Sequence, residues 1–223
     1  MLPLTEAQIK ITQHLYCHEE VKNWRLSDLA LKKARIEFRS NTDEIEVYLK
    51  ASLLNGLYST FLYYSVSKMV ERIIKTFNEK PHIDGYNLVL QLSDEPIDGR
   101  RRLSFASKYA HFFHPHRPPI FDRYAVFALA IHSGRSESYY NSGTDRYKRY
   151  YQDIADLKGA GKFDVDPHQL DRYLWLGGMW VDFKERGNTK INQEALRLFQ
   201  SQHLDCVDAF GKLAGVYHAS LES

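Results

Sequence analysis

Hydrophobic and polar positions along this chain repeat mostly with the period of an α-helix. Apolar residues recur three or four positions apart in most windows, as at Ile45, Leu49 and Leu53, a spacing that places them on one face of a helix. No long window shows the period of two that is typical of a β-strand. The pattern therefore predicts an all-α fold.

Capping residues and prolines divide this pattern into separate helices. The short apolar segment 86–92 fits a helix or a strand, and 94–102, with its Pro and Gly, reads as a loop or hairpin. We expect 133–144 to be a flexible polar loop. The residues expected to cap helices are Thr5 in a capping box with Gln8, Ser27, the segment 41–44, Asp122, and Asp166 followed by Pro167.

The linker-like stretch 80–99 suggests how the helices are organised. It divides the chain into an N-terminal helical lobe, 1–80, and a second lobe, 81–223, whose last helices have the option of packing back on the first. We expect the two lobes to enclose a cleft within a single compact unit.

Composition and charge narrow the class of protein. The chain has 223 residues, 43% of them hydrophobic and 26% charged, which is ordinary for a folded globular protein. Its net charge of +2 gives no global bias towards acidic partners. Cys17 and Cys206 allow one disulfide at most, which favours a reducing compartment. The sequence shows neither a signal-peptide pattern nor an apolar run long enough to span a bilayer. We therefore expect a soluble cytoplasmic monomer with no membrane partner.

The positive charge is concentrated in residues 100–123. This region has six basic residues and one acidic residue, together with three histidines. Basic residues interleaved with Phe and Tyr suit a surface that follows phosphates and stacks on bases; a solvated basic turn is the alternative. The basic residues are Arg100, Arg101, Arg102, Lys108, Arg117 and Arg123.

Lys108 is the candidate nucleophile of this region. Helical spacing places it on one stripe with Ser104, Phe105, His111 and Phe112. Burial among such neighbours lowers the pKa of an amine and leaves part of it neutral and nucleophilic. The alternative is a lysine whose stem carries its charge out to solvent.

Asp122 follows Lys108 by 14 residues and precedes an apolar helix. An N-cap is sufficient to explain an aspartate there. A functional reading adds a second role, in which the carboxylate stabilises an oxocarbenium-like sugar or moves protons beside the amine.

The segments SFASKYAHFFHP and PPIFDRYA, followed by LDRYLW, give the sequence a family resemblance. They resemble the lyase-type helix-hairpin-helix DNA glycosylases, nearest to the 8-oxoguanine DNA glycosylase branch, and uncharacterised bacterial proteins associated with that fold. The likeness is specific over 103–125 and looser at 53–60 and 170–175. The family's hairpin normally reads Leu-Pro-Gly-x-Gly, whereas 95–103 holds a single Gly, and the spacing from Lys to Asp is shorter here.

The resemblance implies a DNA repair enzyme that acts on a modified or damaged base without a cofactor. Lys108 would attack the anomeric carbon of a flipped nucleotide and form a Schiff base, and Asp122 would offset the charge on the sugar. Asn55 or Tyr58 would fill the space left in the duplex, with helix packing as the alternative for both. Arg100, Arg101, Arg102, Arg117 and Arg123 would bind the nucleic acid.

Other readings of the same residues remain open. His111, His114 and His116 lack a standard zinc spacing, so we expect no metal site there. A binding module with a glycosylase-like fold but without catalysis would use the face 100–123 to bind nucleic acid or a protein. A helical interaction protein with no nucleic-acid role would show no salt-sensitive DNA binding.

Overall fold

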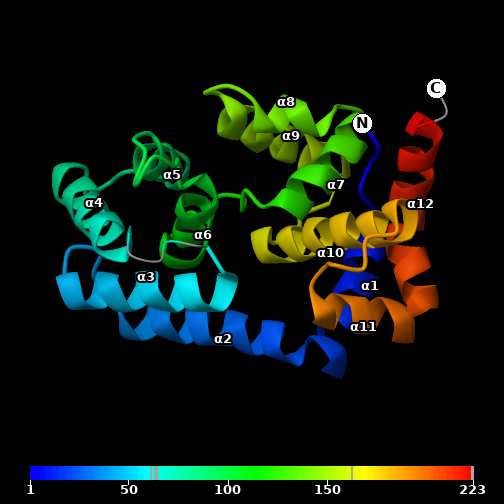
Figure 1. Cartoon of the computed structure of the whole chain (residues 1–223), viewed down its shortest axis with the longest axis horizontal. Helices are drawn as coiled ribbons and strands as arrows, with labels where there is room; N and C mark the ends of the chain where they lie inside the picture. Colours follow the sequence, from blue (N-terminus) through cyan, green and yellow to red (C-terminus); the bar gives the residue numbers. More distant parts are fainter. Residues whose placement is uncertain (61, 63–64, 162, 222–223) are drawn as a thin grey trace. The chain divides into compact units, whose positions relative to one another are not determined.

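The computed structural model describes residues 1–60, 62, 65–161 and 163–221. Over these ranges the chain forms twelve α-helices and one short 3₁₀ helix, with no β-strand (Figure 1). The all-α prediction is therefore confirmed. The segment that fitted a helix or a strand forms α5, Gly85–Ser93, which begins after the N-cap Asp84.

The helices group into two compact units. Unit 1 consists of residues 1–25 and 122–223, and unit 2 of residues 26–121. The boundaries thus lie at 25/26 and 121/122, whereas the linker-like composition placed one near residue 80. The stretch 80–99 is not a linker in the fold, because it contains α5, which packs against α4 and α6 within unit 2.

Unit 2 is built around α6, the helix that carries Lys108. Every residue of α6 except Ser104 is buried. Helices α3 and α5 both pack against it, and α4 packs against α3 and α5. The helices of this unit are α2 (Lys22–Glu37, from Leu26 on), α3 (Glu44–Tyr58), α4 (Val66–Glu79), α5 (Gly85–Ser93) and α6 (Leu103–Phe113).

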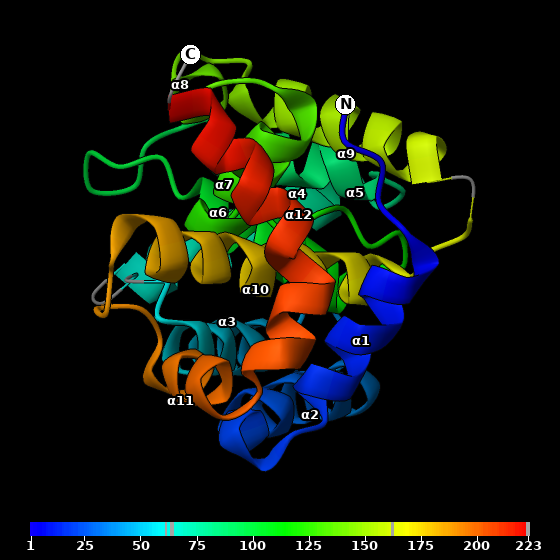
Figure 2. The same cartoon turned by 90° about the vertical axis from the view of Figure 1, so that its right-hand side faces the viewer.

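Unit 1 is built around the long helix α10, against which α1, α7 and α12 pack; Figure 2 shows α1 and α12 side by side. A Cβ added at Gly178 of α10 would lie 2.1 Å from the Tyr124 carbonyl oxygen, so glycine lets the start of α7 lie directly on α10. The helices are α1 (Glu6–Tyr16), η1 (Glu19–Val21), α7 (Arg123–Ser133), α8 (Glu137–Asn141), α9 (Arg146–Gly161), α10 (Pro167–Arg186), α11 (Gln193–Ser201) and α12 (His203–Leu221).

A buried polar network ties the helices of unit 1 together. His132 donates from Nδ1 to the Leu2 carbonyl at 2.8 Å, since a carbonyl only accepts, and its Nε2 lies 3.0 Å from the Tyr173 hydroxyl. Gln8 donates to the same hydroxyl at 3.4 Å and to the Ala209 carbonyl at 3.0 Å. Burial lowers the pKa of His132 to about 4, so this imidazole is neutral near pH 7.

Two helix boundaries differ from the expectations of the sequence. Helix α2 begins at Lys22, directly after η1, so Ser27 lies inside this helix and not at its start. The expected polar loop 133–144 contains α8, which packs on α7 and α9 through the buried Tyr140. Contacts between helices determined both the start of α2 and the presence of α8. The local pattern of polar residues carries no information about such contacts.

Two further properties follow from the described residues. None of their helices has the length and apolar character needed to cross a bilayer. Cys17 and Cys206 are both free thiols, and burial raises the pKa of Cys206 to about 12.

Candidate functional site

The Lys108 side chain is buried on α6 with 4% of the residue's surface exposed. Its Nζ donates a hydrogen bond to Ser104 Oγ at 2.8 Å. Because Ser104, Lys108 and Phe112 are four residues apart, they share one face of the helix. The amine therefore lies beside the Ser104 hydroxyl, in an environment with little water.

The proline loop after α6 is held in place by side chains of that helix. His111 donates from Nδ1 to the Pro118 carbonyl at 2.8 Å, and Ser107 Oγ accepts the Phe121 backbone N–H at 2.9 Å. These two bonds fix both ends of the stretch 118–121. The chain is therefore held against α6 up to Phe121, the last residue of unit 2.

His114 and Gly85 fix the middle of this loop. His114 Nδ1 accepts from the His116 N–H at 3.1 Å, and its Nε2 donates to the Ile83 carbonyl at 2.9 Å. A Cβ on Gly85 would lie 2.2 Å from the His116 carbonyl oxygen, so only glycine fits there. His111 and His114 thus hold the loop, and no group of three potential metal ligands occurs among the described residues.

Asp122 is the first residue after the return to unit 1, and it is the N-cap of α7. Its Oδ1 accepts the Tyr124 N–H at 3.1 Å, as the capping interpretation predicted. The next residue, Arg123, has a largely exposed side chain that lies 3.8 Å from the Asp182 carboxylate.

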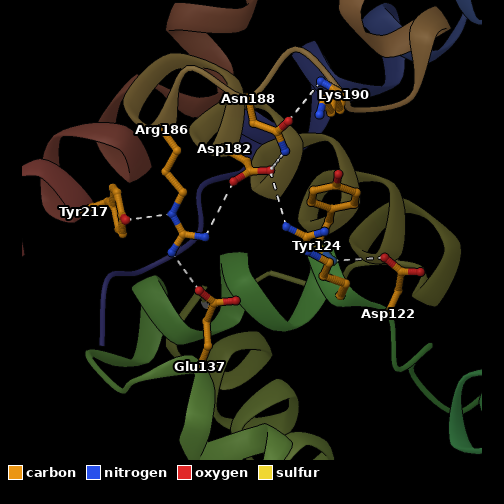
Figure 3. A network of polar contacts seen from close by, with 9 residues as sticks. Asp122, Tyr124, Glu137, Asp182, Arg186, Asn188, Lys190 and Tyr217 are labelled. Carbon is orange, nitrogen blue, oxygen red and sulfur yellow. Dashed lines mark hydrogen bonds and ion pairs between the residues drawn. The ribbon is translucent and has the colours of Figure 1, made fainter.

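Asp182 is the centre of the polar network of unit 1 shown in Figure 3. This buried carboxylate accepts from Asn188 Nδ2 at 2.6 Å and lies 3.6 Å from the Arg186 guanidinium. Arg186 also donates to Glu137 at 2.7 Å and to the Tyr217 hydroxyl at 2.8 Å. The network joins α7, α8, α10 and α12, and so keeps the start of α7 in a defined place.

The arginines 100–102 follow a tight hairpin between α5 and α6. Ile97 and Arg100 form an antiparallel bridge, and the two residues between them have positive φ, 50° at Asp98 and 73° at Gly99. Two positive φ values in succession are typical of a type I′ turn. Asp98 binds Ser65 and, at 2.5 Å, Lys68. Of the two alternatives for 94–102, a loop or a hairpin, the structure has a short hairpin, with Arg100 and Arg101 exposed and Arg102 partly buried.

Asn55 and Tyr58 lie at the end of α3. Asn55 Oδ1 accepts from Thr60 Oγ1 and the Leu62 N–H, both at 2.9 Å, and so holds these two residues near the end of the helix. Tyr58 donates to Asp28, and its ring centre lies 5.3 Å from that of Phe112. These contacts fit the packing alternative for both residues, and they place Tyr58 against the face of α6 that carries Lys108.

A second buried lysine of unit 2, Lys50 on α3, was missed by the sequence reasoning. It is 1% exposed, its Nζ donates to the Ser40 carbonyl and Asn41 Oδ1 at 2.5 and 2.7 Å, and burial lowers its pKa to about 8. The Tyr109 hydroxyl donates to the same Asn41 oxygen at 2.9 Å. The sequence held a signal: Lys50 occupies a core position of the helical repeat between Val47 and Leu54.

The other basic candidate, Arg117, lies on the proline loop and is partly buried. A second arginine, Arg35 on α2, is also partly buried, and the sequence pattern did not single it out. Burial lowers the pKa of Arg35, and repulsion by the positive charge of Arg117 lowers it further.

Comparison with known proteins adds one observation, which concerns most of unit 2 and the end of the first segment of unit 1. Residues 10–117 match a family model, HI_0787_N, whose description is "N-terminal domain". The match covers just under half of the chain, includes Lys108 and Arg117, and ends before Asp122. No curated protein and no solved structure matches the chain. The description names no activity, so the function has to be argued from the residues.

Proposed function

We propose that this protein is a DNA glycosylase and lyase that acts on a modified or damaged base, with Lys108 as the nucleophile and Asp122 as its carboxylate partner. The observation that carries the proposal is the order α5, hairpin, α6, with a buried lysine in the second helix. The lyase-type helix-hairpin-helix glycosylases, which the sequence resembles, carry their lysine on the helix after the hairpin.

In the proposed reaction the neutral amine of Lys108 attacks C1′ of a nucleotide flipped out of the duplex. A C1′–N bond to the lysine forms, the bond from C1′ to the base breaks, and the base leaves with the electron pair and takes up a proton. The amine then loses a proton. Opening of the bond from C1′ to O4′ gives the Schiff base, and O4′ takes up a proton.

The surroundings of Lys108 suit the first step. Ser104 Oγ, 2.8 Å from Nζ, is able to accept a hydrogen bond from either form of the amine, so it orients the lysine without requiring its charge. Asp122 would take the amine proton and offset the positive charge that develops on the sugar.

DNA would be held by its phosphates. The family's glycine-rich hairpin binds a phosphate through backbone amides, whereas the tip of the hairpin here carries Asp98, which binds Ser65 and Lys68. The positive charge therefore lies after the turn, on Arg100, Arg101 and Arg102. A phosphate contact at this hairpin would depend on side-chain charge rather than on amides.

One observation favours the non-catalytic alternative. Asp122 Oδ1 caps α7 through Tyr124, which is sufficient reason for an aspartate at this position. A binding module would use the same basic face without forming a covalent intermediate.

Borohydride trapping on abasic and lesion-bearing oligonucleotides tests the proposal. Borohydride reduces a Schiff base and leaves the protein covalently bound to DNA. We expect the parent to be trapped and Lys108→Gln, which retains a side chain that can bond Ser104, to fold normally and not be trapped. Lys75→Gln is the matched control, because it removes an exposed lysine of the same unit whose ion-pair partner is Glu79 of its own helix; we expect it to be trapped like the parent.

The remaining outcomes decide against the proposal. A parent that binds DNA but is never trapped supports the binding module. Equal trapping of Lys108→Gln and the parent would show that another amine reacts, and the assignment of Lys108 would be wrong. Circular dichroism of each variant verifies that the fold is retained.

A further inference from the structure

Exposed apolar side chains are concentrated on two helices of unit 2, α2 and α3. Twelve large apolar side chains are exposed among the described residues, and seven of them lie on this pair of helices. Such a concentration is typical of a surface that binds another protein. The seven are Leu26, Leu29 and Ile36 on α2, and Ile45, Tyr48, Leu49 and Leu57 on α3.

Helices α2 and α3 are antiparallel neighbours (Figure 1). Asp28 near the start of α2 binds Tyr58 at the end of α3, and the short connection 38–43 joins the other two ends. Leu31 on α2 and Val47 on α3 are fully buried and mark the inner face of each helix. The exposed apolar residues lie mainly on the opposite, outer faces.

The outer face of α2 carries a line of residues that we call the α2 stripe. Their spacing of three, four and three residues places them along one side of the helix. Positive charge accompanies the stripe, because 26–39 exposes three basic side chains, Lys32, Lys33 and Arg39, and one acidic side chain, Glu37. The α2 stripe consists of Leu26, Leu29, Lys33 and Ile36.

A groove with a volume of about 540 Å³ lies between α3 and α4. Tyr48, Val70 and Ile74 give it an apolar lining. Its charged lining is mainly acidic, with three glutamates and one lysine, and that lysine lies 3.9 Å from one of the glutamates, both on α4. The groove therefore carries a net negative charge. The four charged residues are Glu44, Glu71, Lys75 and Glu79.

We propose that the α2 stripe of one copy of the chain docks in the α3–α4 groove of a second copy, so that the protein is a symmetric dimer and not the monomer expected from the sequence. Docking of an amphipathic helix in an apolar groove is a recurring mode of recognition. The basic residues of the stripe would meet the glutamates of the groove, and this complementary charge favours a second copy as the occupant.

Two-fold symmetry follows from the presence of both surfaces on each copy. The stripe of the first copy occupies the groove of the second, and the stripe of the second occupies the groove of the first. The two contacts are then identical, and the assembly closes at two copies. This inference does not depend on the proposed catalysis.

Sedimentation equilibrium of the full chain over a range of protein concentrations tests the dimer. We expect the parent to be a dimer that dissociates on dilution. Ile36→Glu in the stripe and Tyr48→Lys in the groove each place a repelling charge in both contacts, so each should raise the dissociation constant about a hundredfold. Leu204→Glu is the control, because it changes an exposed apolar residue of α12 in unit 1; it should associate like the parent.

A pair of charge reversals tests whether the stripe meets the groove. Lys33→Glu and Glu71→Lys each create like charges in both contacts of their own dimer, and each should weaken association about tenfold. An equal mixture of the two variants restores opposite charges in both contacts of a mixed dimer. We expect this mixture to associate with the affinity of the parent. Both residues are exposed, and circular dichroism verifies that the variants fold.

Several results would overturn the proposal. A parent that stays monomeric at every concentration would leave the groove to a basic helix of a different protein. A dimer that Ile36→Glu or Tyr48→Lys leaves intact, or that Leu204→Glu dissociates, would have its interface elsewhere. A mixture of Lys33→Glu and Glu71→Lys that associates no better than either variant alone would show that the stripe does not face the groove.

Discussion

Asp122 has a structural and a proposed chemical task, and a single substitution separates them. Asparagine caps helices nearly as well as aspartate, so we expect Asp122→Asn to change the free energy of unfolding by less than about 0.5 kcal/mol. It removes the charge that would stabilise the sugar cation, and we expect turnover of a substrate to fall by about two orders of magnitude or more. DNA affinity should hold or increase. Single-turnover kinetics and binding assays measure both, and unchanged turnover would leave Asp122 with the capping role alone.

The lowered pKa of the buried His132 makes the stability of the fold depend on pH in a specific way. Its pKa is about 4 in the fold and about 6.5 when unfolded. Between these values the unfolded chain binds a proton that the folded chain does not, so this contribution to stability is present above pH 6.5 and is lost as the pH falls towards 4. The slope for one proton is at most about 1.4 kcal/mol per pH unit.

Denaturant unfolding of the parent and of His132→Gln at pH 7.5 and pH 5 measures this contribution. Titration of the other groups is common to both proteins, so the parent should lose more stability than the variant on acidification. Equal losses would show that His132 does not remain neutral in the fold.

The residues of the candidate site differ in how far the sequence predicted them. Lys108 and Asp122 stood out because each breaks a local pattern, one as a charge in an apolar stripe and the other at a helix start. Lys50 also breaks its pattern, but its partner Ser40 belongs to no motif, and Asn41 stands out only as part of the expected helix start 41–44. The repulsion between Arg35 and Arg117 could not be predicted, because it arises between residues 82 positions apart in the sequence.

At the level of helices and loops, the contact between α5 and the proline loop gives a sharp prediction. An added Cβ at Gly85 would lie 2.2 Å from the His116 carbonyl oxygen and 2.9 Å from Pro118 Cδ, and neither atom belongs to a flexible side chain. We expect Gly85→Ala to displace the loop and to destabilise the fold by about 1–3 kcal/mol. Gly56→Ala is the control, since its Cβ would meet no atom within 4 Å, and alanine should stabilise α3 by up to about 1 kcal/mol. Chemical denaturation compares the two, and an undisturbed Gly85→Ala would mean that the loop yields easily.

Helix positions were predictable where caps and prolines mark them. The capping box of Thr5 and Gln8, the N-cap Asp122 and the N-cap Asp166 all begin helices as expected. Asn55 and Gly56, two residues with low helix propensity, do not end α3, which continues to Tyr58. Gly56 is exposed, and its cost to the helix of about 1 kcal/mol is outweighed by the packing of the rest of α3.

For the molecule as a whole, the proposed binding of DNA predicts a particular dependence on salt. Each phosphate neutralised on duplex DNA contributes about −0.9 to the slope of log affinity against log salt. Replacing Arg100, Arg101 and Arg102 together by Ala should therefore flatten this slope by up to about 2.7. A charge-matched control replaces the exposed lysines Lys10, Lys190 and Lys212, and its slope should stay close to that of the parent. If the two triple variants have the same slope, the hairpin is not the binding face.

The division of the chain between the two units has a consequence for the order of folding during synthesis. Unit 2 is one continuous segment, whereas unit 1 is interrupted between residues 25 and 122. Gln8 on α1 finds its partner only at Ala209, 201 residues later, and closing so long a loop is slow. During synthesis on the ribosome, the apolar face of α1 therefore stays exposed while unit 2 folds and buries its own core. We expect unit 2 to resist protease in nascent chains well before α1 does.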